Sequence, residues 1–231
     1  FSVGDTALKT RPVVVGLGPA GLFAALLLAR SGFRPLVLER GPELDERVKA
    51  VEHFEKTGEL NLNANIQFGE GGAGTFSDGK LTTRVGDPLC AFVTDAFLQH
   101  GAPADIAWRQ KPHVGTDLLR GIIRSIRQEI IALGGEVRFN TALTGLKIEN
   151  GALASVETTA GDFACEQLIL AVGHSARDTF AMLHGSGLPL ECKPFSVGFR
   201  AEHLQTEIDK SLYHAAAGHP VLPVGEYQLS Q

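Results

Sequence analysis

The sequence predicts an α/β fold in which a parallel sheet is flanked by helices, with an added antiparallel β-meander and part of a second domain. A glycine-rich turn joins an apolar strand to an apolar helix within residues 13–30. A second helix–strand repeat spans residues 118–139, as expected where parallel strands are joined by helical crossovers. Alternating apolar and polar runs in 142–165 are separated by Asn150-Gly151 and Ala160-Gly161, which is typical of antiparallel hairpins.

The first glycine turn has the spacing G-x-G-x-x-G, with glycines at 16, 18 and 21. Gly16 allows a sharp turn after the strand, Gly18 lets a pyrophosphate approach the backbone, and Gly21 lets the helix pack close to the strand. Pro19 and Ala20 begin the helix, whose free N–H groups and positive end would face the phosphates. We interpret this stretch as a Rossmann-like dinucleotide-binding unit. The alternative is an ordinary βαβ unit with a glycine-rich turn.

A second apolar strand, within residues 35–40, ends in an acidic residue. Glu39 follows Gly21 by 18 residues, close to the distance at which such folds place the acid that binds a ribose 2′-hydroxyl. A carboxylate there also disfavours a 2′-phosphorylated ligand, because two negative charges would face each other. Arg40 weakens this objection without reversing it.

A second glycine-rich stretch covers residues 68–81 and contains five glycines between Gly69 and Gly79. Glycine loses the most conformational entropy on folding, so the stretch becomes ordered only if something holds it. Phe68, Phe76 and Leu81 favour a packed loop over the alternative, a flexible linker. Backbone N–H groups of successive small residues can line an anion-binding or ring-binding surface. We therefore predict ligand contacts from Gly71, Gly72, Ala73, Gly74 and Thr75.

Periodicity and turn residues predict the remaining elements. The helix in 43–57 is expected to bury part of one face, including Val48, Val51, His53 and Phe54. Thr116 or Asp117 is expected to cap the long helix that follows. Further helices are expected at 88–100 and 176–184, a sheet strand at 137–139, a buried strand at 167–173, and a strand of a different region at 194–203.

Composition excludes several classes of function. The net charge of −5 gives no nucleic-acid footprint, and no apolar run is long enough to span a bilayer. The three cysteines, Cys90, Cys165 and Cys192, form neither a disulfide framework nor a metal pattern, so we expect a cytoplasmic protein without a metal. The absence of a Cys-x-x-Cys pair argues against a disulfide reductase. The chain has no signal peptide and no initiating Met, so we expect a piece of a longer protein.

Three stretches together carry a family resemblance: the first glycine turn with Glu39, the loop 69–81, and the run Ala171-Val172-Gly173-His174-Ser175-Ala176-Arg177-Asp178-Thr179. The chain resembles the uncharacterised FAD-dependent dehydrogenases of bacteria and plastids, in the glutathione-reductase-type flavoprotein superfamily. Residues 112–117 and 193–200 are also similar to this family. The resemblance covers nearly the whole chain.

The resemblance implies where FAD would bind. The first glycine turn would hold the pyrophosphate, Glu39 the adenosine ribose, and Arg40 would lie near the adenine. Ala142 would give a backbone contact to adenine, and the strand end at Ala171 and Gly173 would form the second dinucleotide contact. The loop 69–81 would approach the ribityl chain or the isoalloxazine ring.

The resemblance also implies a domain division. Residues 1–190 would form the FAD/NAD(P)-binding domain, with an inserted segment at about 84–115, and residues 191–231 would begin a substrate domain. The superfamily's C-terminal Gly-Asp-type segment, which holds the ribityl end of FAD, is not found before residue 231. We therefore expect a truncated chain with weakened FAD binding or none.

A flavin would supply the redox chemistry, and the protein would position it and tune its charge. Lys80 is the candidate cation near the flavin N1, and His113 and His174 are candidate proton-transfer groups. A surface or structural role is the alternative for each, and Arg177 and Asp178 could form a local ion pair. We predict an FAD-dependent oxidoreductase acting on a small-molecule substrate, with NAD(P)H a candidate electron donor. A non-catalytic dinucleotide-binding module and an NAD-dependent dehydrogenase are the alternatives, and the oligomeric state stays open.

Overall fold

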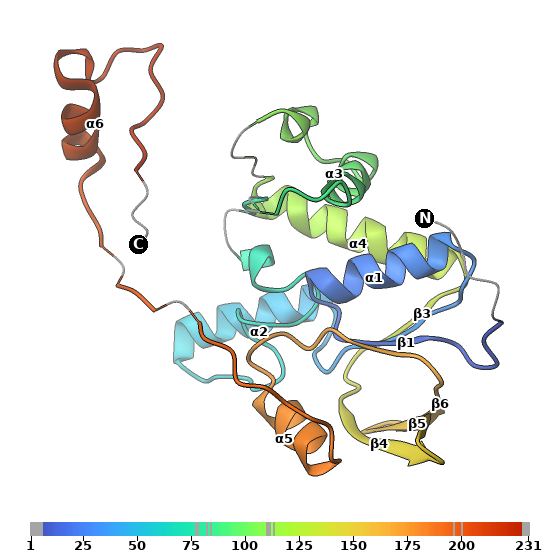
Figure 1. Cartoon of the computed structure of the whole chain (residues 1–231). Helices are drawn as coiled ribbons and strands as arrows, with labels where there is room; N and C mark the ends of the chain where they lie inside the picture. Colours follow the sequence, from blue (N-terminus) through green and yellow to red (C-terminus); the bar gives the residue numbers. More distant parts are fainter. Residues whose placement is uncertain are drawn as a thin grey trace. The chain divides into compact units, whose positions relative to one another are not determined.

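Four short strands form a parallel sheet in the order β3-β2-β1-β7 (Figure 1). In register, Val14 of β1 lies between Val37 of β2 and Ile169 of β7, and Val37 also pairs with Val137 of β3. The computed structural model describes residues 7–76, 79–81, 83, 85–109, 112, 114–195, 197–199 and 201–227. The strands are β1 (Val13–Val15), β2 (Leu36–Leu38), β3 (Glu136–Arg138) and β7 (Leu168–Leu170).

The two central strands are apolar at every position because both faces of the sheet are covered. Val14 and Val37 face one core, which the helices α1 (Pro19–Arg30), α3 (Cys90–Gln99) and α4 (Thr116–Ala132) complete. Phe23 of α1 stacks edge-on against Phe97 of α3, with ring centroids 5.4 Å apart. Figure 1 shows α1 and α4 side by side over this face.

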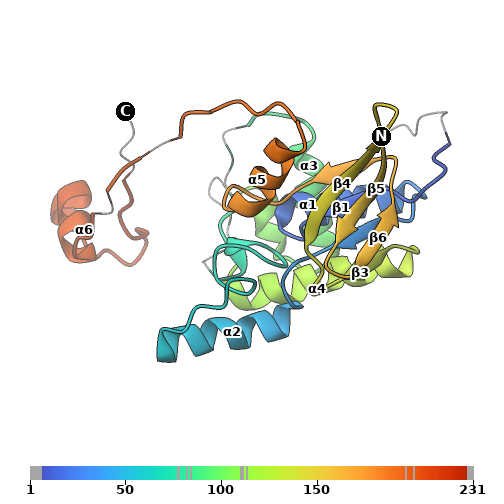
Figure 2. The ribbon, with the colours of Figure 1, turned by 90° about the horizontal axis from the view of Figure 1, so that it is seen from below.

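A three-stranded antiparallel sheet, the predicted meander, covers the other face. It consists of β4 (Leu143–Glu149), β5 (Ala152–Thr158) and β6 (Gly161–Ala164), in that order. Val13 and Val15 of β1 share a core with Val156 of β5. The helix α5 (Arg177–Gly185) packs against β4 (Figure 2). The result is the predicted Rossmann-like arrangement of helices, parallel sheet and antiparallel sheet in three layers.

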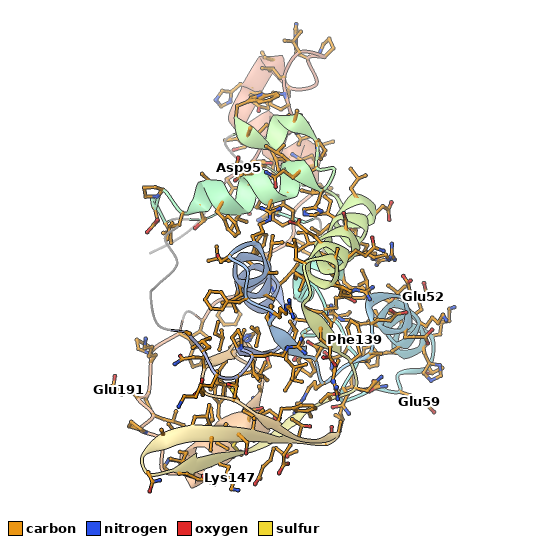
Figure 3. All side chains as sticks on the ribbon, turned by 90° about the vertical axis from the view of Figure 1, so that its right-hand side faces the viewer. Glu52, Glu59, Asp95, Phe139, Lys147 and Glu191 are labelled. Carbon is orange, nitrogen blue, oxygen red and sulfur yellow. The ribbon has the colours of Figure 1, made fainter. Side chains whose placement is uncertain are left out.

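The other elements are helices and short 3₁₀ turns. Only the first half of α2 packs inward: Leu44, Arg47 and Val51 are buried. Glu52 and Glu59 point outward from α2 and the turn after it (Figure 3). The elements are α2 (Leu44–Thr57), η1 (Ala73–Phe76), η2 (Ala104–Ala107), α6 (Gln205–Tyr213) and η3 (His214–Ala216).

Four local expectations were wrong. His53 and Phe54 of α2 are exposed, because the chain after the helix does not fold back over them. Gly115 stands at the N-cap of α4 without a side-chain cap, and the two candidate capping residues lie inside the helix. Strand β7 is only half-buried, because it is an edge strand. No described residue of 194–203 belongs to a strand, although its aromatic and aliphatic residues alternate.

The chain divides into two compact units, Phe1–Pro189 and Leu190–Gln231. The first contains the three layers, and residues of α3 and η2 from the predicted insertion enter its helical core. In the second, α6 has no buried residue, and Gly225 N–H donates to Asp209 Oδ1 at 2.6 Å. Within the described part of the chain, no helix has the length and apolarity that crossing a bilayer requires. The functional assignment of the two units stays a prediction.

Candidate functional site

A cavity of about 510 Å³ lies where strands β1, β2 and β7 end. The N-terminus of α1, the glycine-rich loop and α5 form its other walls. Parallel α/β sheets bind ligands at the carboxyl ends of their strands, and this volume is typical of small-molecule sites. Of the candidate site residues, the cavity brings together Gly16, Gly18, Pro19, Ala20, Glu39, Arg40, Gly72, Ala73, Ala171 and Gly173.

The three glycines of the first turn do different work. A Cβ on Gly16 (φ +96°) would lie 2.4 Å from the Ala171 carbonyl oxygen, and one on Gly21 would lie 1.8 Å from the Gly16 carbonyl oxygen. These two glycines therefore allow backbone to meet backbone, as predicted for the turn and for the helix packing. A Cβ on Gly18 would meet no atom within 4 Å, although Gly18 lines the cavity. The space in front of Gly18 is thus open to a ligand.

Gly18 is also the N-cap of α1, and no side chain caps the helix. The first N–H groups of a helix have no partner within the helix, and Pro19 at the first position removes one of them. The remaining N–H groups and the positive end of the helix dipole lie at the cavity wall formed by Gly18, Pro19 and Ala20. This arrangement suits a phosphate or pyrophosphate group.

Glu39 lines the cavity with only 3% of its surface exposed. Its carboxylate accepts hydrogen bonds from Leu17 N–H (Oε2, 2.8 Å) and Gly41 N–H (Oε1, 2.9 Å). Burial raises the pKa of this carboxyl group, and the two N–H donors with Arg47 and Arg40 oppose the rise. Each carboxylate oxygen accepts more than one hydrogen bond, so a hydroxyl donor in the cavity can still be bound.

The glycine-rich loop is bonded to the first glycine turn. Gly71 N–H donates to the Leu17 carbonyl at 2.8 Å, so Leu17 joins the loop to the turn and the turn to Glu39. A Cβ on Gly72 (φ +72°) would lie 2.6 Å from Cδ of Pro19. Only a glycine therefore lets the loop approach the start of α1 this closely, and the packed loop predicted from the sequence is confirmed.

The buried side chain of Arg47 holds the loop from inside. Its Nη1 donates to the carbonyls of Glu70 (2.7 Å) and Gly72 (2.9 Å) and to Thr75 Oγ1 (3.0 Å). Its Nε and Nη2 donate to the carbonyls of Asn65 (3.0 Å) and Ile66 (3.1 Å). Burial lowers the pKa of Arg47 to about 10, so the guanidinium stays charged at neutral pH. One cation thus binds five oxygens of the segment 65–75.

Glu70 is the second buried charge of the loop. Its Oε2 accepts from Leu44 N–H at 2.7 Å. Its Oε1 lies 2.8 Å from Arg127 Nε, an ion-pair contact whose angle is too poor for a hydrogen bond. Burial raises the pKa of Glu70, and Arg127 opposes the rise.

The ring of Phe76 lies near two guanidinium groups, 4.7 Å from that of Arg47 and 5.0 Å from that of Arg120. The loop is therefore anchored on both α2 and α4.

Comparison with known proteins agrees with this geometry. The family model described as "FAD-dependent protein, C-terminal domain-like" matches residues 194–231. An uncharacterized protein of Clostridium beijerinckii is 50% identical over 227 residues, 98% of this chain and 43% of the relative. Digeranylgeranylglycerophospholipid reductase 1 of Methanococcoides burtonii is 27% identical over 218 residues, 92% of this chain and 49% of that protein. The chain is thus similar to an FAD-dependent protein family over residues 194–231 and to a reductase over most of its length.

A solved structure shares the fold of this chain. THI4 of Thermovibrio ammonificans superposes with a TM-score of 0.50 at 15% identity, covering 78% of this chain and 64% of THI4. The chain spans less than half the length of the curated relatives above.

Several candidate residues do not line the cavity. Gly71 and Thr75 are buried on the inner side of the loop, where a Cβ on Gly71 would lie 2.4 Å from both Ile123 Cδ1 and Thr75 Cγ2. Gly21 and Gly74 also lie outside the cavity lining. Ala142 uses both backbone polar groups in 3.0 Å hydrogen bonds with Thr159, so its neighbours line the wall instead.

Most of the cofactor candidates line the cavity, whereas the described catalytic candidates do not. Lys80 is exposed and does not line the cavity. His174 is exposed and directly follows the lining residue Gly173, with its Nε2 3.4 Å from Ser175 Oγ. His113 lies outside the described residues. The cavity therefore receives neither of the two described candidates, because both side chains stay at the surface.

Sequence reasoning missed Arg47 and Glu70, which hold the glycine-rich loop without lining the cavity. It also missed three lining residues of α5, Thr179, Phe180 and Leu183. Arg47 and Glu70 look like surface charges in the sequence, on an amphipathic helix and in a polar loop. A signal for Arg47 was present, since it shares a helical stripe with Leu44 and Val51 at spacings of three and four. Asp178, for which a local ion pair with Arg177 was one option, pairs instead with Arg40 across the cavity rim.

Proposed function

We propose that this chain binds FAD in the cavity and forms the dinucleotide-binding part of an FAD-dependent oxidoreductase. The observation that carries the proposal is the uncapped start of α1 beside Gly18, where a side chain is absent and the space is open. Glu39 lies in the same cavity, where its carboxylate suits a ribose hydroxyl. The donor set thus fits the ADP half of a dinucleotide.

The remaining walls suit the rest of the cofactor. Phe68 and the small residues Gly72 and Ala73 line the side formed by the glycine-rich loop, which supports a close approach to a flat ring. The turn after β7, at Ala171 and Gly173, lies opposite and would hold the second backbone contact. FAD, when bound, supplies two-electron transfer to or from an organic substrate. This chain's residues bind and orient it.

The proton-transfer groups are part of the same proposal. His174 is our first candidate because it is one residue from the cavity lining, whereas Lys80 and His113 rest on the sequence alone. NAD(P)H is the proposed electron donor, and the three unpaired cysteines support a reducing, cytoplasmic location.

The ADP half alone would equally suit an NAD-dependent dehydrogenase or a non-catalytic binding module. The glycine-rich loop favours a ligand that extends beyond the ADP half, because a ligand that stopped there would not need a second glycine-rich wall. The antiparallel meander and the strand end at Ala171 and Gly173 favour FAD over NAD, as do the similarities to an FAD-dependent family and to a reductase.

Gly18→Val is expected to weaken FAD binding by at least about tenfold while leaving the fold intact, because the added side chain enters only the open space where the pyrophosphate would lie. The φ of −67° and ψ of −177° at Gly18 are extended backbone that valine adopts freely. Binding is measured by titrating FAD and following the quenching of flavin fluorescence.

The matched control is Gly86→Val, a substitution at an exposed glycine with open space around it and outside the cavity. It is expected to bind FAD as the parent chain does. Equal FAD affinity of Gly18→Val and the parent chain would show that the phosphates lie elsewhere.

A further inference from the structure

An ion pair lies at the rim of the cavity, between the end of β2 and the start of α5. Arg40 follows Glu39, and Asp178 is the second residue of α5. Nη2 of Arg40 bonds Oδ2 of Asp178, and Nη1 lies 3.3 Å from Oδ1, so the guanidinium faces both oxygens of the carboxylate. The hydrogen bond from Arg40 holds the pKa of Asp178 below its usual value, and the pair is charged at neutral pH.

In dinucleotide-binding folds, an arginine placed like Arg40 can bind the ligand itself. A guanidinium beside the ribose-binding acid can accommodate a 2′-phosphate, to which its planar fork would bind with two parallel hydrogen bonds. Arg40 lines the cavity, and its side chain is 24% exposed. In this chain the guanidinium of Arg40 is instead paired with the carboxylate of Asp178 on α5.

The negative charge of Glu39 is not by itself enough to exclude a 2′-phosphate from this end of the cavity. The N–H groups of Leu17 and Gly41 already bind its two oxygens, and Arg40 on the next residue would offset its negative charge. Asp178 adds a second carboxylate and pairs with Arg40, so that the guanidinium no longer offsets the charge of Glu39 alone. A 2′-phosphate would face this charge without a free cation from Arg40.

We propose that Asp178 is a specificity-determining residue: by holding Arg40, it makes the cavity select adenosine ligands with a free ribose 2′-hydroxyl and reject 2′-phosphorylated ones. This inference rests on the proposed binding of a dinucleotide in the cavity. Asp178 acts through Arg40 and is a positioning residue.

The test compares ADP with its 2′-phosphorylated counterpart, titrated into the full chain by calorimetry at one fixed salt concentration. Asp178→Asn keeps the shape and the polar groups of the side chain but removes its charge. The variant is expected to bind ADP within about twofold of the parent chain and to shift the affinity ratio toward the 2′-phosphate by at least about fivefold, as one freed charge-assisted pair allows. Adding Arg40→Gln to this variant is expected to abolish the shift.

Asp45→Asn is the matched control. Asp45 also lies in the first turn of a helix, pairs with an arginine (Arg124, 2.6 Å), and has a side chain 61% exposed, against 62% for Asp178. Exposed pairs contribute little to stability, so both variants are expected to fold with unchanged thermal midpoints. The control is expected to leave the affinity ratio unchanged.

The possible failures differ. If the parent chain and Asp178→Asn bind ADP with the same preference against the 2′-phosphate, Asp178 does not set the specificity, while the proposed function stands. If Asp45→Asn shifts the ratio as much as Asp178→Asn, the effect is one of bulk charge and the inference is overturned. If the parent chain binds neither nucleotide, the proposed function fails and the inference fails with it.

Discussion

Arg47→Met is expected to lower the free energy of unfolding by about 3–5 kcal/mol, the cost typical of removing one partner from a buried charged network. Arg47 is fully buried and donates to five oxygens of the segment 65–75. Methionine fills similar volume but removes all five hydrogen bonds, although the Gly72 carbonyl still accepts one from Thr75 Oγ1, and it removes a cation that stabilises the Glu39 carboxylate. The loss is measured by urea denaturation, with circular dichroism as the probe.

The destabilisation of Arg47→Met is expected to depend on pH. The pKa values of Glu39 and Glu70 are already raised in the folded chain, and losing Arg47 raises them further. A carboxyl group whose pKa is raised in the folded state binds more protons there than in the unfolded state. The free energy of unfolding therefore falls as the pH rises above the ordinary pKa of that group. The variant should therefore lose less stability at about pH 5 than at about pH 8.

Lys49→Met is the matched control, on the same helix with a side chain 69% exposed. Exposed substitutions of this kind change stability by about 0.5 kcal/mol or less. Arg47→Lys is expected to fall between the two, since lysine keeps the charge but not the planar fork. Stability of Arg47→Met within about 1 kcal/mol of the parent chain would contradict the anchoring role of Arg47.

Gly21→Ala is expected to destabilise the first unit by about 3 kcal/mol or more, because a single added methyl group is forced against backbone. Its Cβ would lie 1.8 Å from the Gly16 carbonyl oxygen and 3.4 Å from Ala171 Cβ, so helix α1 would have to move away from the end of β1. The change is measured as the shift of the urea midpoint at constant m-value.

Gly121→Ala makes the same substitution inside a helix, in α4, where a Cβ meets no atom within 4 Å. Replacing an exposed helical glycine by alanine stabilises a protein by about 0.5–1 kcal/mol. The two variants should therefore shift the urea midpoint in opposite directions. A shift of Gly21→Ala in the stabilising direction would mean that the contact of α1 with β1 is looser than described.

The sequence was sufficient wherever the signal is local. Three valines before the glycine turn predicted β1, and the period of the isoleucines predicted α4, because strands and helices show their buried faces as simple repeats. The Asn150-Gly151 turn located the meander, because this pair of residues is typical of a tight hairpin turn. Glu39 was predicted to lie at the site from its distance along the chain, and it lines the cavity.

What the sequence could not supply depends on distant contacts. The helical stripe with Leu44 and Val51 indicates the inner face for Arg47, but its partners in residues 65–75 depend on where that segment folds back, which periodicity does not encode. Alternating residues predicted a strand at 194–203, but a strand also needs a partner, and no described segment pairs with it.

The most direct test of the central claim is whether this chain retains a flavin. The purified chain is incubated with FAD or with FMN, desalted, and scanned for visible flavin absorbance. We expect a flavin spectrum with FAD, at less than one FAD per chain because the expected truncation weakens binding, and none with FMN, because the cavity at the start of α1 and Glu39 suits the ADP half that only FAD carries. Equal retention of both, or retention of FMN alone, would contradict the proposed site. If the chain bound NAD but no FAD at any concentration, its cofactor would be a nicotinamide dinucleotide and the flavin proposal would be wrong.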